Sequence, residues 1–384
     1  MKRTLVFIVG AALAVSGGLL SGQTVPTIQF DSNPMPLSMP DSIHLGEVAG
    51  VATSSKGEIY VYTRTGNPTI TIATARAVAH GGGRLFVFDR AGKYVREIGQ
   101  GIYGFLQPQQ VRVDAQDNIW IVDQMSTQVV KFDPNGRVQM VLSRKPEAVT
   151  VPNPRLAPLP TGVPVIMPEP PAGGRGGGGG EDGGGRGGGA RAGGPAPLPG
   201  AGVEGESFNR PTDVAWDAQG NIYVADGYGN ARIAKYDRNG KWLKNWGSRG
   251  TGQGQFNIVH GIAIDAQGNV YVGDEGNKRV QVFDGEGTFK TQFTNVGAPT
   301  ALCLTRGAQP ALYVAHTGDP DGMEDATIYK VDLQGNVLGK FGSAGKLPKE
   351  FGLVNSIDCR NENELLVGEL ANWRVQKLTL RAAK

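Results

Sequence analysis

Residues 208–247 read FNRPTDVAWDAQGNIYVADGYGNARIAKYDRNGKWLKNWG, and residues 256–293 read FNIVHGIAIDAQGNVYVGDEGNKRVQVFDGEGTFKTQF. The second stretch begins 48 residues after the first, and self-similarity at such a fixed period is typical of solenoids and propellers. Each copy holds four short β-rich runs separated by turn dipeptides such as Gln219-Gly220 and Asn239-Gly240. Four strands per repeat without helical periodicity predict one blade of a β-propeller.

Four further copies surround this pair, at residues 48–99, 107–143, 299–342 and 353–381. The last copy ends after three strands, and an open blade would leave an exposed strand edge. A spare strand candidate lies at Thr27–Phe30, near Ile28. We therefore predict an all-β, six-bladed β-propeller whose ring is closed by an N-terminal strand that completes the last blade.

The chain divides into four predicted parts. Residues 1–22 have a basic start, an apolar core and small residues at the end, which is typical of a secretory signal peptide. A retained transmembrane anchor is the alternative, although glycines interrupt the apolar run. Residues 23–145 form blades 1 and 2 with the closing strand, residues 146–206 form an insert, and residues 207–384 form blades 3–6.

The insert is rich in proline and glycine, and its middle reads PEPPAGGRGGGGGEDGGGRGGGARAGG. It has too few apolar residues to offset the entropy of ordering, so we expect disorder. Arg-Gly-Gly runs occur in RNA-binding segments, but a solvated spacer fits an exported chain better. The formal net charge of +3 falls to +1 once Lys2 and Arg3 are removed. This near-neutral balance argues against a nucleic-acid or anionic-membrane binder.

Taken together, these features predict export to the periplasm or the extracellular space, with no membrane span after removal of the signal peptide. Export would permit a disulfide, and Cys303 and Cys359 are the two cysteines. Both fall in inner strands of successive repeats. Aligning PTALCL with VNSIDC puts them one residue out of step, and neighbouring residues in a strand point to opposite faces. We therefore expect two buried free thiols.

A recurrent loop motif of Asp, Asn and Arg follows the second strand of several repeats. Because it recurs, we interpret it as architectural, with Asp and Asn shaping the loop and Arg bridging blades. Polar residues that do not recur are better candidates for function, because ligands bind where propeller loops converge. Arg64, Tyr228 and His260 stand out in this way. The motif comprises Asp226, Asn230 and Arg232, then Asp274, Asn277 and Arg279, and in reduced form Asn372-Trp373-Arg374.

The segments FNRPTDVAWD, IYVADGYGNARIAKYD and GQFNIVHGIAI resemble the NHL-repeat propeller of the peptidyl-α-hydroxyglycine α-amidating lyases, with the strongest similarity over residues 208–283. The resemblance implies a lyase that splits a hydroxyglycine carbinolamide into a peptide amide and glyoxylate. It also implies a zinc ion held by three histidines, a catalytic Tyr with Arg residues, and a calcium site. Zinc with three protein ligands keeps one position open for the substrate hydroxyl.

By this resemblance Tyr228 takes the place of the catalytic Tyr, Arg64 that of an Arg, and His260 that of one zinc ligand. Gln109 and Asn355 stand where the other two zinc histidines are expected. Further departures are Glu275 at the position of a second Arg, Ser356 at that of an acidic residue that supports calcium, and Asn209 and Gly229 at positions of paired cysteines. His316 is a candidate for a second zinc ligand.

These departures lead to three hypotheses. The first is a propeller with a degraded zinc site that binds a small molecule, peptide or protein partner at the channel mouth, through Arg64, Gln109, Tyr228, His260, Glu275, His316 and Asn355. No cofactor is then expected, and zinc and calcium follow only from the resemblance. The second is a divergent peptidylamidoglycolate lyase or hydrolase that uses Tyr228, Arg64 and His260, with Glu275 as base. The third is an extracellular scaffold that binds proteins through blade edges and the insert.

Overall fold

The computed structural model describes residues 25–64, 70–72, 76–78, 82–102, 104–143, 205–317 and 325–381. The predicted signal peptide and nearly all of the predicted insert lie outside the described residues. Within the described ranges there is no α-helix, and the one helical turn is the 3-10 turn η1 (Glu275–Asn277). None of the helical structure found there is long and apolar enough to cross a membrane.

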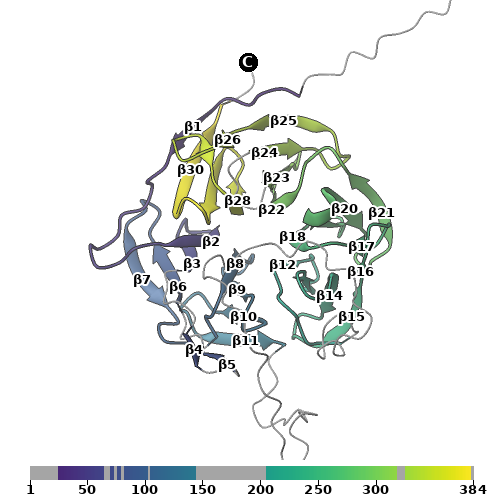
Figure 1. The fold of residues 1–384 in the computed structure, drawn as a ribbon, viewed down its shortest axis with the longest axis horizontal. Helices are drawn as coiled ribbons and strands as arrows, with labels where there is room; N and C mark the ends of the chain where they lie inside the picture. Colours follow the sequence, from purple (N-terminus) through teal and green to yellow (C-terminus); the bar gives the residue numbers. More distant parts are fainter. Residues whose placement is uncertain are drawn as a thin grey trace, which may run out of the picture.

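Six four-stranded antiparallel sheets make up the described core (Figure 1). Blades 1 and 2 consist of β2 (Glu47–Thr53), β3 (Ile59–Arg64), β6 (Gly83–Phe88) and β7 (Tyr94–Ile98), and of β8 (Pro108–Val113), β9 (Ile119–Asp123), β10 (Gln128–Phe132) and β11 (Val138–Leu142). Blades 3 and 4 consist of β12 (Asp213–Trp216), β13 (Ile222–Asp226), β14 (Arg232–Tyr236) and β15 (Trp242–Trp246), and of β18 (Val259–Ile264), β19 (Val270–Asp274), β20 (Arg279–Phe283) and β21 (Phe289–Phe293).

The last two sheets are blade 5, with β22 (Pro299–Leu304), β23 (Leu312–Thr317), β24 (Ala326–Val331) and β25 (Val337–Phe341), and blade 6, with β28 (Val354–Asn361), β29 (Glu364–Glu369), β30 (Arg374–Leu380) and β1 (Phe30–Asn33). Three small pairs lie outside the blades: β4 (Ile70–Ile72) with β5 (Arg76–Val78), β16 (Ser248–Arg249) with β17 (Gln255–Phe256), and β26 (Ser343–Ala344) with β27 (Glu350–Phe351).

The inner strands β2, β8, β12, β18, β22 and β28 surround the channel, and each contacts the next around the ring, including β28 with β2 (Figure 1). The predicted all-β, six-bladed propeller is therefore confirmed. Closure by an N-terminal strand is also confirmed, because β1 pairs antiparallel with β30 and turns three strands into a complete blade 6.

The closing strand is displaced along the chain from its predicted position. It runs over Phe30–Asn33, not Thr27–Phe30. The preceding residues instead lie against the outer strand of blade 5, where the Ile28 N–H donates to the Lys340 carbonyl and the Lys340 N–H donates to the Pro26 carbonyl, at 2.9 Å each. The N-terminal segment thus connects blades 5 and 6 along the rim.

Apolar side chains fill the spaces between neighbouring blades. Trp120 of blade 2 and Trp216 of blade 3 have ring centroids 5.2 Å apart. Every residue of β13 is buried, because a middle strand has a neighbouring blade on each of its faces. Each fully buried large apolar side chain contributes roughly 1.5–3 kcal/mol relative to exposure. The ring is therefore stabilised mainly by contacts between blades.

Tight turns join inner and second strands in most blades. In blade 3 the Asp217 carboxylate accepts hydrogen bonds from the backbone N–H groups of Gln219 and Asn221, each at 2.9 Å. Gly220 has φ +84°, a conformation that glycine adopts without steric cost. The same turn recurs in blade 2 as DAQDN and in blade 4 as DAQGN, with the same bonds from the Asp carboxylate to backbone N–H groups.

The recurrent Asp, Asn and Arg loop is architectural, as predicted. Arg232 Nε donates to Asp226 Oδ2 at 2.9 Å, and Arg232 Nη2 donates to the carbonyl of Ser207. Asn230 also donates to Asp226. The arginine therefore ties the loop of its own blade to the segment that enters from the preceding blade.

The prediction of free thiols was wrong, because Cys303 of β22 and Cys359 of β28 form a disulfide. Each blade packs one sheet face against the preceding blade and the other face against the following blade. Residues at equivalent positions of two neighbouring inner strands therefore point the same way around the ring and cannot meet. A contact between the two strands needs residues one position apart, because adjacent residues of a strand point to opposite faces. The offset that seemed to separate the cysteines is the offset that lets them pair.

Candidate active site

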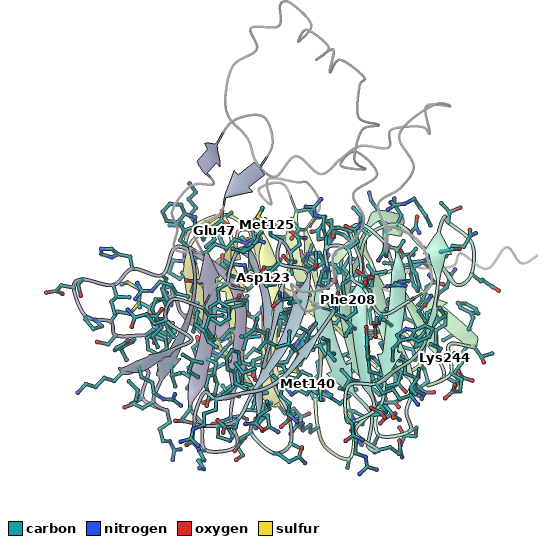
Figure 2. The ribbon with its side chains drawn as sticks, turned by 90° about the horizontal axis from the view of Figure 1, so that it is seen from below. Glu47, Asp123, Met125, Met140, Phe208 and Lys244 are labelled. Atoms are coloured by element: carbon teal, nitrogen blue, oxygen red, sulfur yellow. A yellow bond between two sulfur atoms is a disulfide. The ribbon has the colours of Figure 1, made fainter. Side chains whose placement is uncertain are left out.

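The candidate site residues lie at one end of the ring, where inner strands begin and second strands end. Glu47 at the start of β2 pairs with Arg64 at the end of β3, and Val259 at the start of β18 pairs with Asp274 at the end of β19. The first residues of inner strands and the last residues of second strands therefore lie at the same end of the ring. Figure 2 shows Glu47 and Met125 at this face and Met140 toward the other. We call this end the site mouth and define it by Arg64, Gln109, Tyr228, His260 and Asn355.

A repeated β-bulge aims side chains into the site mouth. The register of the first two strands shifts near the start of the inner strand in five blades, at the third residue of β2 and at the second residue of β8, β18, β22 and β28. An extra residue in one strand re-aims its side chain and is common next to functional sites. These bulge residues are Ala49, Gln109, His260, Thr300 and Asn355.

A chain of hydrogen bonds crosses the site mouth from blade 1 to blade 4. Glu47 forms an ion pair with Arg64 at 3.2 Å. Arg64 Nη2 donates to Gln109 Oε1 at 3.0 Å, and Gln109 Nε2 lies 3.2 Å from His260 Nε2. Because the amide oxygen accepts from Arg64, its nitrogen faces the imidazole and donates to it. We therefore assign the His260 proton to Nδ1.

The environment of His260 keeps its ring neutral. Burial lowers the pKa of His260 to about 4, and the charge of Arg64 acts in the same direction. The charge of Asp213 and a backbone hydrogen bond with Thr300 raise this pKa, but by less. At neutral pH the ring therefore accepts hydrogen bonds at Nε2, as the orientation of Gln109 requires.

Tyr228 reaches His260 from the loop between β13 and β14. A side chain on Gly227 would collide with the carbonyl of Val259, 1.7 Å from the position of its Cβ, so glycine allows the loop to pass directly over the start of β18. The rings of Tyr228 and His260 are 5.8 Å apart and nearly perpendicular. The Arg210 guanidinium carbon lies 5.0 Å from the centre of the Tyr228 ring, within the range of a cation–π contact.

Asn355 belongs to the same network, although its contacts are with backbone. Its amide Nδ2 donates to the carbonyls of Ala49 at 2.6 Å and Gln109 at 2.8 Å. It therefore joins the inner strands of blades 6, 1 and 2. This role is structural and leaves little freedom for the side chain to turn toward a ligand.

Two further candidates stand apart from this network. His316 Nδ1 accepts the N–H of Ala298 at 2.8 Å, and its Nε2 pairs with Asp325 at 3.0 Å. The Oε2 atom of Glu275, in η1, is buried without a hydrogen-bond partner among the described residues. Burial raises the pKa of Glu275 to about 7, so this carboxyl group changes charge near neutral pH.

The repeats match a described family. A sequence profile of the NHL repeat matches residues 208–236 and 256–283, and a profile described as a 6-bladed beta-propeller matches residues 79–140. The chain is an NHL-repeat β-propeller. These matches identify the architecture and the repeat, and they assign no reaction.

Several named proteins are similar in sequence to this NHL propeller. Peptidyl-alpha-hydroxyglycine alpha-amidating lyase 1 of Drosophila melanogaster is 27% identical over 301 residues, 72% of this chain and 45% of that protein. Peptidyl-glycine alpha-amidating monooxygenase A of Xenopus laevis is 30% identical over 44% of this chain and 19% of its own length. NHL repeat-containing protein 3 of Mus musculus is 40% identical over 28% of this chain and 32% of its own length. This chain thus spans less than half the length of each of these three.

Among solved structures, a streptogramin B lyase superposes with a TM-score of 0.52 at 12% identity, over 92% of this chain and 98% of that one. Virginiamycin B lyase from Staphylococcus aureus gives a TM-score of 0.50 at 12% identity, over 92% of this chain and 100% of that one. Similarity at this level of identity concerns the fold alone.

The side chains present do not fit the zinc site that the resemblance implies. The Nε2 lone pair of His260 already accepts from Gln109, and amide side chains are poor zinc ligands. The candidate second ligand, His316, has both ring nitrogens bonded to other protein groups, Nδ1 to the Ala298 N–H and Nε2 to Asp325. In the part of the chain that the structure describes, no three His, Cys, Asp or Glu side chains form a group able to hold a metal.

The calcium position that the resemblance implies fits no better. Ser356 stands where an acidic residue is expected, and its hydroxyl donates to Gln110 Oε1 at 2.8 Å and accepts from the Val51 N–H at 3.1 Å. Calcium prefers several carboxylate and carbonyl oxygens. Here protein partners occupy the hydroxyl, and among the described residues no cluster of three or more acidic, His or Cys side chains could hold the ion.

Sequence reasoning missed the ion pair that closes the channel below the site mouth. Arg112 Nε and Nη2 contact the Asp213 carboxylate at 2.9 and 2.6 Å. The guanidinium also donates across the channel to the carbonyls of Leu302 at 3.0 Å and Ile357 at 3.3 Å. The sequence could have indicated this ion pair, because Arg112 in QVRVD and Asp213 in PTDVA are charged residues that do not recur at the same position of the other inner strands.

Proposed function

We propose that this NHL propeller is an exported binding protein that takes a small molecule or peptide at the site mouth without a resident zinc ion. The carrying observation is the hydrogen bond from Gln109 to His260, because it occupies the lone pair that a metal would need. A zinc site of the catalytic type requires three protein ligands and one open position. With Gln109 and Asn355 in place of two histidines, the site mouth presents amide groups and one neutral imidazole to a ligand.

Several groups at the mouth remain suited to ligand recognition. Tyr228 offers an aromatic ring that lies 5.8 Å from the His260 ring. Arg210 is exposed and has no ion pair with a carboxylate among the described residues. Aromatic side chains with nearby guanidinium groups bind planar amides and carboxylates well. We therefore expect an acylated or peptidyl ligand that carries a carboxylate.

The test uses α-hydroxyhippurate, which carries an amide, a hydroxyl and a carboxylate. The purified chain should bind it without releasing glyoxylate, and Tyr228→Ala should weaken binding about tenfold. Zinc measured in the same preparation should be far below one ion per chain. Stoichiometric zinc that disappears in His260→Ala would overturn the proposal of a metal-free site.

A second candidate function is a divergent lyase or hydrolase, and Glu275 favours it. A carboxyl group with a pKa of about 7 and an oxygen lacking a hydrogen-bond partner is suited to general base catalysis at neutral pH. Glyoxylate release that is lost in both Tyr228→Phe and Glu275→Gln would establish this function. Glyoxylate release that is unchanged in both variants would show that neither Tyr228 nor Glu275 is a catalytic residue of this reaction.

Export is proposed from residues 1–22 alone. Fractionation of cells that express the full chain should recover a protein shortened by about 22 residues outside the cytoplasm. Full-length protein in the membrane fraction would contradict removal of the segment and favour the retained anchor.

A further inference from the structure

A cavity occupies the end of the channel opposite the site mouth. Its volume is about 440 Å³, and residues from all six inner strands or the turns that follow them line it. Arg112, held by Asp213, lies between this cavity and the site mouth. Cavities of 300–1,000 Å³ with mostly apolar walls and few polar groups are typical of small-molecule sites. The walls here include Val113, Ile262 and Leu302.

One turn at this end departs from the repeat. In blades 2, 3 and 4 the residues that close the turn by a backbone hydrogen bond are four apart, as in Asp265 and Asn269. In blade 5 the corresponding pair is Thr305 and Ala311, six apart. The two extra residues form a longer turn that carries Arg306 to the cavity wall. A feature confined to one blade is not needed for the ring.

The other charged side chains at this cavity are committed to protein partners. Asp358 accepts from the Thr53 N–H at 2.6 Å, and Asp265 accepts from its own turn. Arg360 crosses the opening to the carbonyl of Val113 at 3.1 Å. Arg306 has neither a hydrogen bond nor an ion pair with any described residue.

The surroundings of Arg306 favour an anion. Arg306 is exposed at the opening; partial desolvation and, to a smaller degree, the nearby charge of Arg360 lower its pKa. The carboxylates of Asp358 and Asp117 act in the opposite direction with smaller effect. An anion placed beside the two guanidinium groups would relieve their repulsion, and a carboxylate matches the planar guanidinium with two parallel hydrogen bonds.

We infer that this cavity is a second ligand site, for a small carboxylic acid with an apolar body. The acid's carboxylate lies against Arg306 at the opening, and its apolar part lies between the inner strands above the Cys303–Cys359 disulfide. The inference is independent of the proposed function, because Arg112 and Asp213 separate this cavity from Tyr228 and His260.

Calorimetric titration of the full chain with 3-phenylpropionate tests the inference. Saturable binding is expected, and Arg306→Ala should weaken it at least about tenfold, as for loss of a charge-assisted hydrogen bond. Arg306→Lys should retain part of the affinity. The matched control is Arg238→Ala, an exposed arginine in the β14–β15 turn of blade 3, which should leave binding unchanged.

Two comparison ligands and one further variant separate the alternatives. Neutral 3-phenylpropan-1-ol and inorganic phosphate should each bind about tenfold more weakly or not at all, since each lacks one half of the recognised chemistry. His260→Gln should leave binding of 3-phenylpropionate unchanged. Absence of saturable binding, equal binding of the alcohol or of phosphate, or binding that is lost in His260→Gln but kept in Arg306→Ala would each overturn the inference.

Discussion

Gln109 Nε2 on blade 2 and His260 Nε2 on blade 4 lie 3.2 Å apart across the site mouth. Both residues occupy the bulge at the second position of an inner strand. The backbone therefore directs these two side chains toward one another, as metal ligands would have to be directed. Whether a metal can bind then depends on which side chains occupy the two positions. The proposal of a metal-free site mouth can therefore be tested by substituting histidines at these positions.

Introducing two histidines should create a zinc site. The double variant Gln109→His, Asn355→His places three imidazoles at bulge positions and should bind about one zinc ion per chain, whereas the wild type should bind far less. Metal analysis after dialysis measures the difference. Asn355→His gives up hydrogen bonds to two carbonyls, which should cost about 1–3 kcal/mol of stability.

Adding His260→Ala to that double variant is the matched control, because it removes one of the three ligands and leaves the other substitutions in place. Zinc should then fall back to the level of the wild type. Zinc retained without His260 would show that the ion binds elsewhere on the chain.

His260 and Glu275 should give stability opposite dependences on pH. The folded pKa of His260 is about 4, below the unfolded value of about 6.5, so stability falls by up to about 3 kcal/mol as pH falls from about 6.5 to 4. The folded pKa of Glu275 is about 7, above its unfolded value of about 4.3. Stability therefore falls as pH rises from about 4.3 to 7, by a smaller amount because the side chain is partly exposed.

The two dependences overlap and partly cancel in the wild type, so single variants should expose each one. Urea unfolding of Glu275→Gln should show stability falling as pH is lowered from about 7 to 5, and His260→Gln should show it falling as pH is raised over the same range. If the free energy of unfolding depends on pH in the same way in the wild type and in both variants, neither pKa is shifted in the folded state.

The sequence predicted the architecture because each repeat carries its own turns and strands. The DAQGN turns and the loop of Asp226, Asn230 and Arg232 recur, and recurrence separated framework from candidate site. Arg64, Tyr228 and His260 lie at one end of the ring, where Gln109 bonds to both Arg64 and His260 and the Tyr228 ring lies against that of His260. Residue identity alone could not reveal the bulges, since they arise from pairing between strands.

Contacts between blades were the harder part. The Cys303–Cys359 disulfide was not predicted because the alignment assumed that equivalent faces of neighbouring blades meet. In the propeller, opposite faces of neighbouring blades meet. The pairing of Arg112 with Asp213 was missed because 101 residues separate them in the chain. Both pairs depend on how blades stack around the channel, which a repeat pattern does not specify.

The disulfide should add measurably to stability. It links residues 56 apart, and closing a loop of that length in the unfolded chain stabilises the fold by about 4 kcal/mol in the chain-entropy model. Cys303→Ser, Cys359→Ser should therefore unfold at lower urea concentration than the wild type. Addition of a reductant should lower the midpoint of the wild type and leave that of the double variant unchanged. Equal midpoints for the oxidised wild type and the variant would contradict the prediction.

The ion pair between Arg112 and Asp213 should be coupled strongly. Asp213 is 1% exposed, and its carboxylate also accepts the N–H groups of Val214 at 2.8 Å and Ile262 at 3.1 Å. Arg112→Met leaves this charge buried without its partner and should cost about 3–5 kcal/mol. Asp213→Asn should cost a similar amount by leaving the guanidinium uncompensated.

The double variant Arg112→Met, Asp213→Asn removes both charges while keeping an acceptor for one backbone N–H. Its loss of stability should be smaller than the sum of the two single losses by about 2 kcal/mol or more, since charges in contact at a buried site are not additive. Urea unfolding of the four proteins measures this coupling. Additive losses would show that the two residues act separately, and the channel would then be closed by the hydrogen bonds from Arg112 to Leu302 and Ile357 alone.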